Sequence, residues 1–187
     1  MTLTPSGTTE LGTKAPDFRL PDTDGTMVSL GDFDDYKGLV VVFMCNHCPY
    51  VKHIRDALAE FARRNTPLGV GTVGINSNDV VSHPADSPER MREEAQAAGY
   101  TFPYLFDETQ DVAVSYGAEC TPDFFLFDES KCLVYRGQFD DSRPGNDVEI
   151  TGKDLQSAVD ALLNAEPPLA HQAPSVGCNI KWKAKTG

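Results

Sequence analysis

The chain has 187 residues and a formal net charge of −12 at pH 7, with 40% hydrophobic and 24% charged residues. This is the composition of one globular domain that buries roughly 70% of its unfolded surface. Nucleic-acid binding needs a basic face, so the charge argues against such a partner. No apolar run reaches the roughly 18 residues of a membrane span, and the start lacks the segments of a secretory signal. We therefore expect a cytoplasmic protein with no membrane partner.

The predicted elements follow a flexible N-terminal arm at residues 1–15, which is rich in Thr, Gly and Pro. Two short runs on either side of the Asp-Gly turn at 24–25 predict a hairpin. The apolar, β-branched run at 39–44 predicts a strand buried on both faces. A helical period over 47–64 and a second apolar run at 68–75 then complete a strand–helix–strand unit.

The second half of the chain predicts further helices and strands. They are a helix between Ser87-Pro88 and Gly99, a short helix at 110–116, strands at 123–128 and 133–137, and a helix behind a capping box at Thr151–Asp154. Strand–helix–strand crossovers imply parallel pairing, and the late hairpin adds an antiparallel pair. We expect one α/β domain at 16–165 and a Pro-rich, extended tail at 166–187 that packs on it.

Five cysteines are the most informative residues. They are Cys45, Cys48, Cys120, Cys132 and Cys178. An odd number in a chain without a secretion signal is not typical of a structural disulfide framework. The close spacing in Cys45-Asn46-His47-Cys48 indicates redox chemistry or a metal site instead.

The position of this pair favours redox chemistry. Cys45 ends the predicted buried strand, and Cys48 falls in the first turn of the predicted helix. Free N–H groups and the positive end of the helix dipole favour the thiolate there, which is the reactive form. We expect Cys45, at the exposed edge, to attack a substrate disulfide and Cys48 to resolve the mixed disulfide. A protonated His47 would stabilise the reduced form and make the pair more oxidising.

Two other interpretations of the pair stay open. Cysteines at this spacing also occur as inert buried thiols or as half of a zinc or copper site. A zinc site needs a second ligand pair, and no second CxxC or HxxxH follows, although His53 lies five residues after Cys48. We therefore expect no resident metal or other cofactor, and protein or small-molecule thiols and disulfides as partners.

Two longer segments carry a resemblance to a known superfamily. They read APDFRLPDTDGTMVSLGDFDDYKG and TFPYLFDETQDVAVSYGAECTPDFFLFD. Over Ala15–Asn164, the chain resembles the thioredoxin superfamily, and within it the branch shared by peroxiredoxin-like (AhpC/TSA-type) and TlpA/ResA-type proteins. The resemblance implies a thioredoxin-like three-layer fold: a central mixed β-sheet with helices on both faces, an N-terminal β-hairpin extension and an extended C-terminal tail.

The resemblance also implies roles for four residues. Pro122 would be a cis-proline facing the cysteine pair, and Thr121 would present backbone groups to a bound substrate chain. A proline at the start of a strand has no ladder N–H, which leaves an edge where a substrate backbone can dock. Asn46 and His47 stand where thioredoxin has Gly-Pro, and they are candidates for active-site support.

A peroxidase that reduces hydroperoxides, with an antioxidant role, is the alternative function. The peroxiredoxin pattern aligns its peroxidatic cysteine with Cys48. That pattern has Thr or Ser three residues earlier and Pro seven residues earlier, where this chain has Cys45 and Val41. The buried acid of thioredoxin corresponds to Leu39, so the proton acceptor for resolution is unassigned, with His47 and water as candidates.

Five further residues need an interpretation. Cys120 and Cys178 are predicted either to form an accessory disulfide or relay, or to be two semi-buried thiols with packing roles. Trp182 could lie in a groove and hold the tail in place. Arg143, in a polar loop, is either a contact for an anionic or peptide substrate or part of a plain surface connection. His83 lies in a polar loop and carries no functional signal. We expect the chain to be a monomer or a homodimer.

Overall fold

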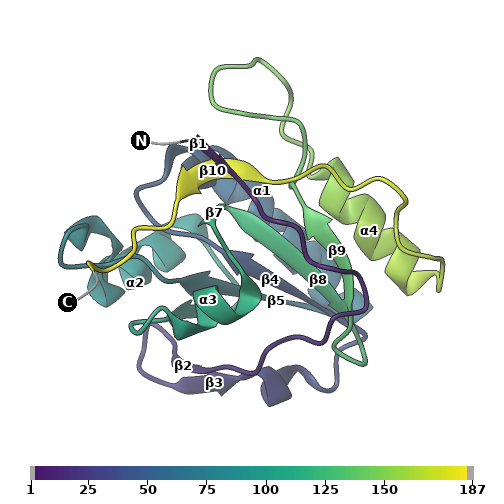
Figure 1. The fold of residues 1–187 in the computed structure, drawn as a ribbon, viewed down its shortest axis with the longest axis horizontal. Coiled ribbons are helices and arrows are strands. Elements are labelled where there is room, and N and C mark those ends of the chain that lie inside the picture. The colour runs from purple at the N-terminus through teal and green to yellow at the C-terminus, as the bar shows by residue number, and fades with distance from the viewer. Residues whose placement is uncertain (1–2, 185–187) are drawn as a thin grey trace.

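The structure is a computed structural model that describes residues 3–184; residues 1–2 of the expected arm and 185–187 of the expected tail lie outside it. Its middle layer is a five-stranded sheet (Figure 1) in the order β6-β5-β4-β8-β9. These strands are β6 (Tyr104–Phe106), β5 (Val70–Asn76), β4 (Gly38–Phe43), β8 (Asp123–Asp128) and β9 (Leu133–Gly137). β4, β5 and β6 run parallel, and β8 is antiparallel to both β4 and β9. The predicted mixed sheet is confirmed.

The middle strand β4 separates two cores. All six of its residues are buried. Val40 and Val42 pack into one core, while Leu39, Val41 and Phe43 pack into the other. This follows because successive side chains of a strand point to opposite faces. The uninterrupted apolar run is therefore a strand buried on both faces, as predicted.

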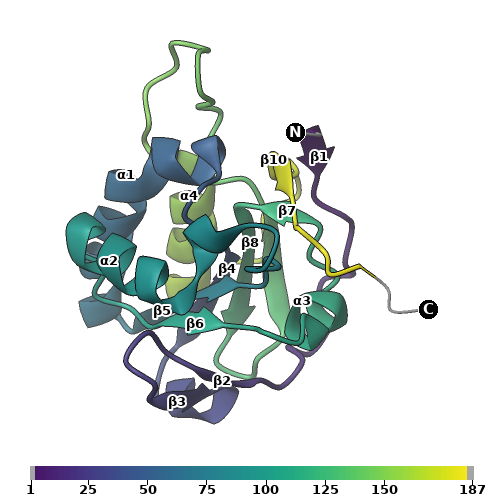
Figure 2. The ribbon, with the colours of Figure 1, turned by 90° about the vertical axis from the view of Figure 1, so that its left-hand side faces the viewer.

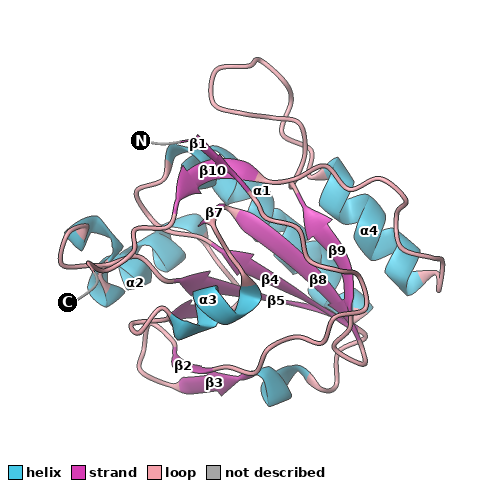
Figure 3. Ribbon diagram, in the orientation of Figure 1, coloured by secondary structure: helices cyan, strands magenta, loops and turns pink. Residues whose placement is uncertain are grey.

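Helices cover both faces of the sheet (Figures 2 and 3). The first core is covered by α1 (Pro49–Asn65), α2 (Pro88–Ala98) and α4 (Lys153–Leu163), and the second by α3 (Asp111–Tyr116) and the hairpin of β2 (Arg19–Pro21) and β3 (Met27–Ser29). Three short 3-10 turns are η1 (Leu30–Phe33), η2 (Thr66–Leu68) and η3 (Pro84–Asp86). No helix in the described part of the chain is long and apolar enough to cross a membrane.

The two ends of the described chain meet in a second, three-stranded sheet (Figures 1 and 2). It consists of β1 (Leu3–Pro5), β10 (Val176–Asn179) and β7 (Cys120–Thr121), paired antiparallel in the order β1-β10-β7. The sequence predicts a flexible arm and an extended tail without pairing between them, and the pairing of β1 with β10 corrects this. Because this pairing joins residues at opposite ends of the chain, no local sequence pattern predicts it.

The tail is held by residues other than the one predicted. Trp182 remains 44% exposed, so it does not fill a groove as expected. Cys178 and Ile180 are buried instead. The backbone N–H of Ile180 donates to the carbonyl of Glu119 at 3.0 Å, which fastens the segment to the turn before β7.

Two local predictions differ from the structure. β6 was not predicted, because a run of three residues is too short to show a strand period. α4 begins at an N-cap glycine, Gly152, and not at a capping box of Thr151. The first-turn N–H groups of Asp154 and Leu155 are accepted by the carbonyl oxygen of Phe139 at 3.2 and 3.3 Å. The carboxylate of Asp140 holds the residues just before the helix, since it accepts the backbone N–H groups of Thr151 and Gly152 at 2.7 and 2.6 Å.

The close packing of β10 on β7 depends on a glycine. A Cβ atom on Gly177 would run into the carbonyl group of Thr121. We expect Gly177→Ala to lower the free energy of unfolding by about 1–3 kcal/mol, because the strand must shift to make room. Denaturant unfolding measures this loss. Gly31→Ala is the control, since its Cβ would meet nothing closer than 3.8 Å, and an equal effect of the two substitutions would contradict the explanation.

Candidate active site

Cys45 and Cys48 lie in the connection between β4 and α1. β4 ends at Phe43, Cys48 is the N-cap residue of α1, and Pro49 opens the helix, where a missing N–H costs nothing. The strand–turn–helix placement agrees with the prediction, with the helix beginning two residues later than expected. The expected exposure of Cys45 is wrong: Cys45 is 1% exposed and Cys48 is 0% exposed.

The sulfur atoms contact groups from three parts of the chain. Cys45 Sγ lies 3.6 Å from the hydroxyl of Thr121 and 3.8 Å from Nδ1 of His47. Cys48 Sγ lies 3.2 Å from the carbonyl oxygen of Thr121 and 3.0 Å from Sγ of Cys178. Thr121 therefore touches both cysteines, whereas the resemblance implies for it a backbone contact with a substrate chain. His47 lies on the Cys45 side, although it adjoins Cys48 in the sequence.

The two cysteines have opposite pKa shifts. The hydrogen bond to Cys48 and burial raise the pKa of Cys45 well above its ordinary value, and the nearby charge of Asp86 adds to this. The hydrogen bond from Cys45 lowers the pKa of Cys48 and outweighs burial, with further hydrogen bonds from Thr121 and Cys178. When protonated, Cys48 donates to the Thr121 carbonyl; once it is deprotonated, neighbouring thiols donate to it. These directions favour Cys48, and not Cys45, as the cysteine that ionises first.

A buried carboxylate that the sequence analysis missed organises the turn between the cysteines. Asp86, at the end of η3, is 0% exposed. Its Oδ1 accepts the backbone N–H groups of Asn46 and His47 at 2.9 and 3.1 Å, and its Oδ2 accepts the side-chain amide of Asn78 at 2.8 Å. Burial alone would raise the pKa of Asp86, but the hydrogen bonds from His47 and Asn78 bring it below its ordinary value. The acid is therefore ionised and part of the site.

His47 pairs with this acid at the most open part of the site. Its Nδ1 lies 2.5 Å from Oδ2 of Asp86, and its side chain is 18% exposed. The ring stacks on that of His83, with centroids 5.1 Å apart. His83 therefore belongs to the surroundings of the site, although its polar loop carried no signal in the sequence.

Asn46 supports the same turn. Its side-chain amide donates to the carbonyl of Ala85 at 2.9 Å, and its carbonyl oxygen accepts the hydroxyl of Tyr104 at 3.0 Å. These bonds join the turn to η3 and to β6. Asn46 is thus a positioning residue that leaves no side-chain group directed at a substrate in this arrangement.

The edge beside Thr121 and Pro122 is occupied. The peptide bond between them is cis, as the resemblance implies. The expected docking edge, however, is covered by the chain itself, because Cys178 of β10 pairs with Thr121. A substrate backbone cannot pair there while β10 is in place.

The predicted accessory pair of Cys120 and Cys178 is replaced by a different one. The register places Asn179, not Cys178, opposite Cys120. The sulfur of Cys178 meets that of Cys48 instead, and Cys120 Sγ lies 3.8 Å from the carbonyl oxygen of Pro122. Burial, together with the charge of Asp123, raises the pKa of Cys120 far above its ordinary value, so this thiol is inert.

A metal interpretation can be tested on the same side chains. Ligand atoms of Cys45, His47 and Asp86 all lie within 4.8 Å of one another. Zinc holds its nitrogen and oxygen ligands at roughly 2.0–2.2 Å in a tetrahedron, so two of them stand more than about 3 Å apart. The 2.5 Å between His47 Nδ1 and Asp86 Oδ2 is a hydrogen-bond distance. The arrangement therefore fits a proton better than a shared metal ion.

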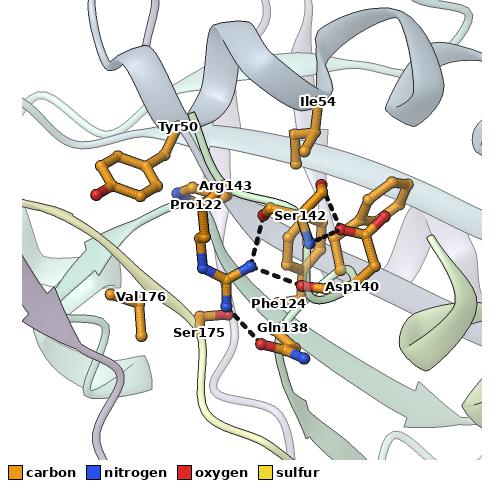
Figure 4. A pocket seen from close by; sticks show the side chains of 11 residues that line it. Tyr50, Ile54, Pro122, Phe124, Gln138, Asp140, Ser142, Arg143, Ser175 and Val176 are labelled. Atoms are coloured by element: carbon orange, nitrogen blue, oxygen red, sulfur yellow. Dashed lines mark hydrogen bonds between the residues drawn. The ribbon is translucent and has the colours of Figure 1, made fainter. Parts of the chain in front are cut away.

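A small pocket lies beside Pro122, between the first turn of α1 and the start of β10 (Figure 4). Its lining includes Tyr50, Pro122, Arg143 and Val176. The guanidinium of Arg143 is turned onto its own loop, where Nη1 donates to the carbonyls of Asp140 and Ser142 at 2.6 and 2.7 Å. Arg143 thus holds the loop between β9 and α4 together.

The fold defines the class of protein. With a TM-score of 0.62 and 18% identity, the chain is similar to the thioredoxin domain of a thiol-disulfide oxidoreductase from Bacteroides vulgatus, over 80% of this chain and 98% of that one. The predicted thioredoxin-like fold is confirmed. The family follows from residues 11–136, which match the model of the AhpC/TSA family. The chain belongs to the AhpC/TSA family.

Other similar proteins carry less specific names. A crystal structure of a hypothetical protein from Sinorhizobium meliloti 1021 shares 51% identity and a TM-score of 0.96, covering 97% of this chain and 99% of that one. Two sequences named "Putative peroxiredoxin", from two strains of Mycobacterium tuberculosis, are 35% identical over 111 residues, which is 57% of this chain. The match spans 63% of the length of these curated relatives, which is less than two thirds.

The charge of Asp86 can be removed with little change in shape. Asp86→Asn keeps an oxygen that accepts the N–H groups of Asn46 and His47. Because the carboxylate charge contributes to the raised pKa of Cys45, we expect that pKa to fall in the variant. An NMR titration of the Cys45 Cβ resonance measures the shift. Asp111→Asn, at an exposed acid of α3, is the control, and an unmoved Cys45 titration would contradict the assignment.

Proposed function

We propose that the protein is a thiol-disulfide oxidoreductase that uses Cys45 and Cys48 as a dithiol–disulfide couple. The observation that carries this proposal is the placement of the two cysteines at the start of α1, where Thr121 contacts both sulfur atoms, and the opposite directions of their pKa shifts support it. A thiolate is the nucleophile in thiol–disulfide exchange, and a neighbouring thiol that can lose its proton is what resolves the product. Membership of the AhpC/TSA family, which indicates a redox enzyme, supports this.

The chemistry proceeds in two exchanges. The Cys48 thiolate attacks one sulfur of the substrate disulfide, forms a mixed disulfide and releases the first substrate thiolate. Cys45 then gives up its proton and attacks the Cys48 sulfur, so that a Cys45–Cys48 bond forms and the second substrate thiolate leaves. Two electrons pass from the pair to the substrate. His47 and Asp86, beside Cys45, are placed to receive the proton of Cys45.

Access to the pair decides what kind of substrate it takes. Both cysteines are buried and β10 covers the edge at Thr121. A disulfide of either kind therefore reaches Cys48 only when β10 has moved away. We propose thiols and disulfides, of small molecules or of proteins, as the partners of that opened form.

Single-turnover reduction of oxidised glutathione tests the proposal. Cys48→Ser removes the thiolate and leaves Cys45 as the attacking sulfur. Even with an ordinary pKa, only about 3% of such a thiol is ionised at pH 7, so we expect the reaction to slow by at least about 30-fold. Cys132→Ser, which alters a cysteine remote from the site, should leave the rate unchanged. Disulfide mapping of the wild-type protein equilibrated with glutathione should show the Cys45–Cys48 bond. An unchanged rate in Cys48→Ser, or no such bond at any glutathione ratio, would refute the proposal.

Reduction of hydroperoxides is the second candidate function. It is favoured by the family match and by the lowered pKa of Cys48, whose position aligns with the peroxidatic cysteine. Cys45 and Val41 stand where that pattern has Thr or Ser and Pro, so we expect hydrogen peroxide to oxidise the reduced protein more slowly than oxidised glutathione does at equal concentration. Stopped-flow measurement of both reactions decides, and the reverse order would make the protein a peroxidase.

A further inference from the structure

Strand β10 occupies the sheet edge beside the cysteine pair in the manner of a docked peptide. Cys178 lies opposite Thr121, and Asn179 lies opposite Cys120, in antiparallel pairing. Addition of an extended segment to a free sheet edge is a recurrent mode of peptide recognition, in which the backbone provides affinity and selected side chains enter the site. Here the added segment belongs to the chain itself.

The side chain that this segment brings into the site is a thiol. Cys178 Sγ lies 3.0 Å from Cys48 Sγ, and both residues are buried. A disulfide has an S–S distance of roughly 2.05 Å, so about 1 Å of movement separates this contact from a bond. Gly177 precedes Cys178 and permits the close approach to Thr121 that sets the position of the sulfur.

The thiols of Cys178 and Cys45 both keep their protons more firmly than an ordinary cysteine, which suits disulfide exchange at Cys48. Burial, and then the hydrogen bond to Cys48, raise the pKa of Cys178 above its ordinary value. Cys45 is also a thiol with a raised pKa. The Cys48 sulfur therefore has two thiol neighbours, one in its own turn and one in β10, and either can become its disulfide partner.

We propose that Cys178 is a third redox thiol and that β10 is a substrate strand carried by the chain itself, with which the Cys45–Cys48 disulfide exchanges. Cys178, as its thiolate, attacks Cys48 Sγ of the oxidised pair. The Cys48–Cys178 bond forms while the Cys45–Cys48 bond breaks, and the electron pair of the broken bond leaves on Cys45. Cys45 takes up one proton for the one that Cys178 has lost, so the step consumes no external oxidant.

This inference rests on the proposed function, which supplies the oxidised pair. Its product differs from the usual oxidised form in two ways. The Cys48–Cys178 bond fastens β10 over the site by a covalent link. It also returns Cys45 to the thiol state beside His47, the most open part of the site.

Disulfide mapping of the full chain tests the proposal. The protein is equilibrated with reduced and oxidised glutathione, quenched with acid, alkylated with N-ethylmaleimide, digested with trypsin and analysed by mass spectrometry. Cys45 and Cys48 share the tryptic peptide 38–52, and Cys178 lies in 154–181. We expect the wild-type protein to yield both the internally oxidised 38–52 peptide and a cross-linked 38–52/154–181 species.

Three variants identify the sulfurs involved. Cys45→Ser leaves Cys48 as the sole cysteine of its peptide, and the cross-linked species should persist. Adding Cys178→Ser to Cys45→Ser removes the only cysteine of 154–181, and Cys48 should then be recovered as a mixed disulfide with glutathione. Adding Cys120→Ser to Cys45→Ser is the matched control, because Cys120 is a buried cysteine of the adjoining strand β7, and the cross-link should remain. Circular dichroism of each variant confirms that it is folded.

The outcomes separate this inference from the proposed function. If the wild-type protein and Cys45→Ser never give the cross-linked species, while the Cys45–Cys48 bond forms in the wild type, Cys178 is no redox thiol and the proposed function stands. If the Cys45–Cys48 bond never forms, the proposed function fails, and exchange with Cys178 fails with it. A cross-link that forms in Cys45→Ser but never in the wild-type protein would also overturn the inference, because the Cys45–Cys48 bond would then not exchange with Cys178.

Discussion

The carboxylate of Asp86 constrains the turn between the two cysteines, and the arrangement of the site depends on it. Its two oxygens accept two backbone N–H groups of that turn and the amide of Asn78, and they face the His47 ring. A buried charge is stable only when such donors surround it. The backbone between Cys45 and Cys48 supplies two of those donors, and the carboxylate charge fixes the conformation of that backbone. Cys45 and Cys48 are therefore presented to each other by a residue from the segment before α2.

The second constraint is the cover that β10 provides. A thiolate with a lowered pKa is a reactive group, and exposure would open it to oxidation by any oxidant in solution. Here the thiolate of Cys48 lies beneath β10, with the Cys178 sulfur against it. The site thus combines an activated sulfur with restricted access, and the same strand that limits access contributes a further thiol. Four segments far apart in the sequence meet within this small volume.

The elements that position the site could be predicted from the sequence, because their patterns are local. The apolar run of β4, the helical period of α1 and the close cysteine spacing all lie within a few residues of one another. Asp86 and Cys178 could not be placed in this way, since each reaches the site by tertiary packing alone. The helix dipole favours both cysteines as thiolates, so it could not show which one ionises. The hydrogen bonds to Cys48 decide that, and apart from Cys45 their donors come from β7 and β10.

The burial of Cys45, which was expected to be exposed, shows the same limit of prediction from local sequence. A residue between a strand and a helix is expected at the rim of the sheet, and the sequence has no feature that reveals a cover from the tail. Arg143 and Trp182 illustrate the converse case. Both residue types are typical of binding sites, but one is bound to its own loop and the other is half exposed. Residue type alone does not separate a ligand contact from a structural one.

The sheet formed by β1, β10 and β7 also affects the order in which the protein folds. Pairing Thr4 with Gly177 closes a loop that includes nearly the whole chain, and such distant closures are slow compared with the formation of helices and neighbouring strands. During synthesis the segments before β10 emerge first and can fold as they appear. A chain in which β10 has not yet paired therefore leaves the Thr121 edge beside Cys45 and Cys48 uncovered, and the two thiols are then most accessible to oxidants.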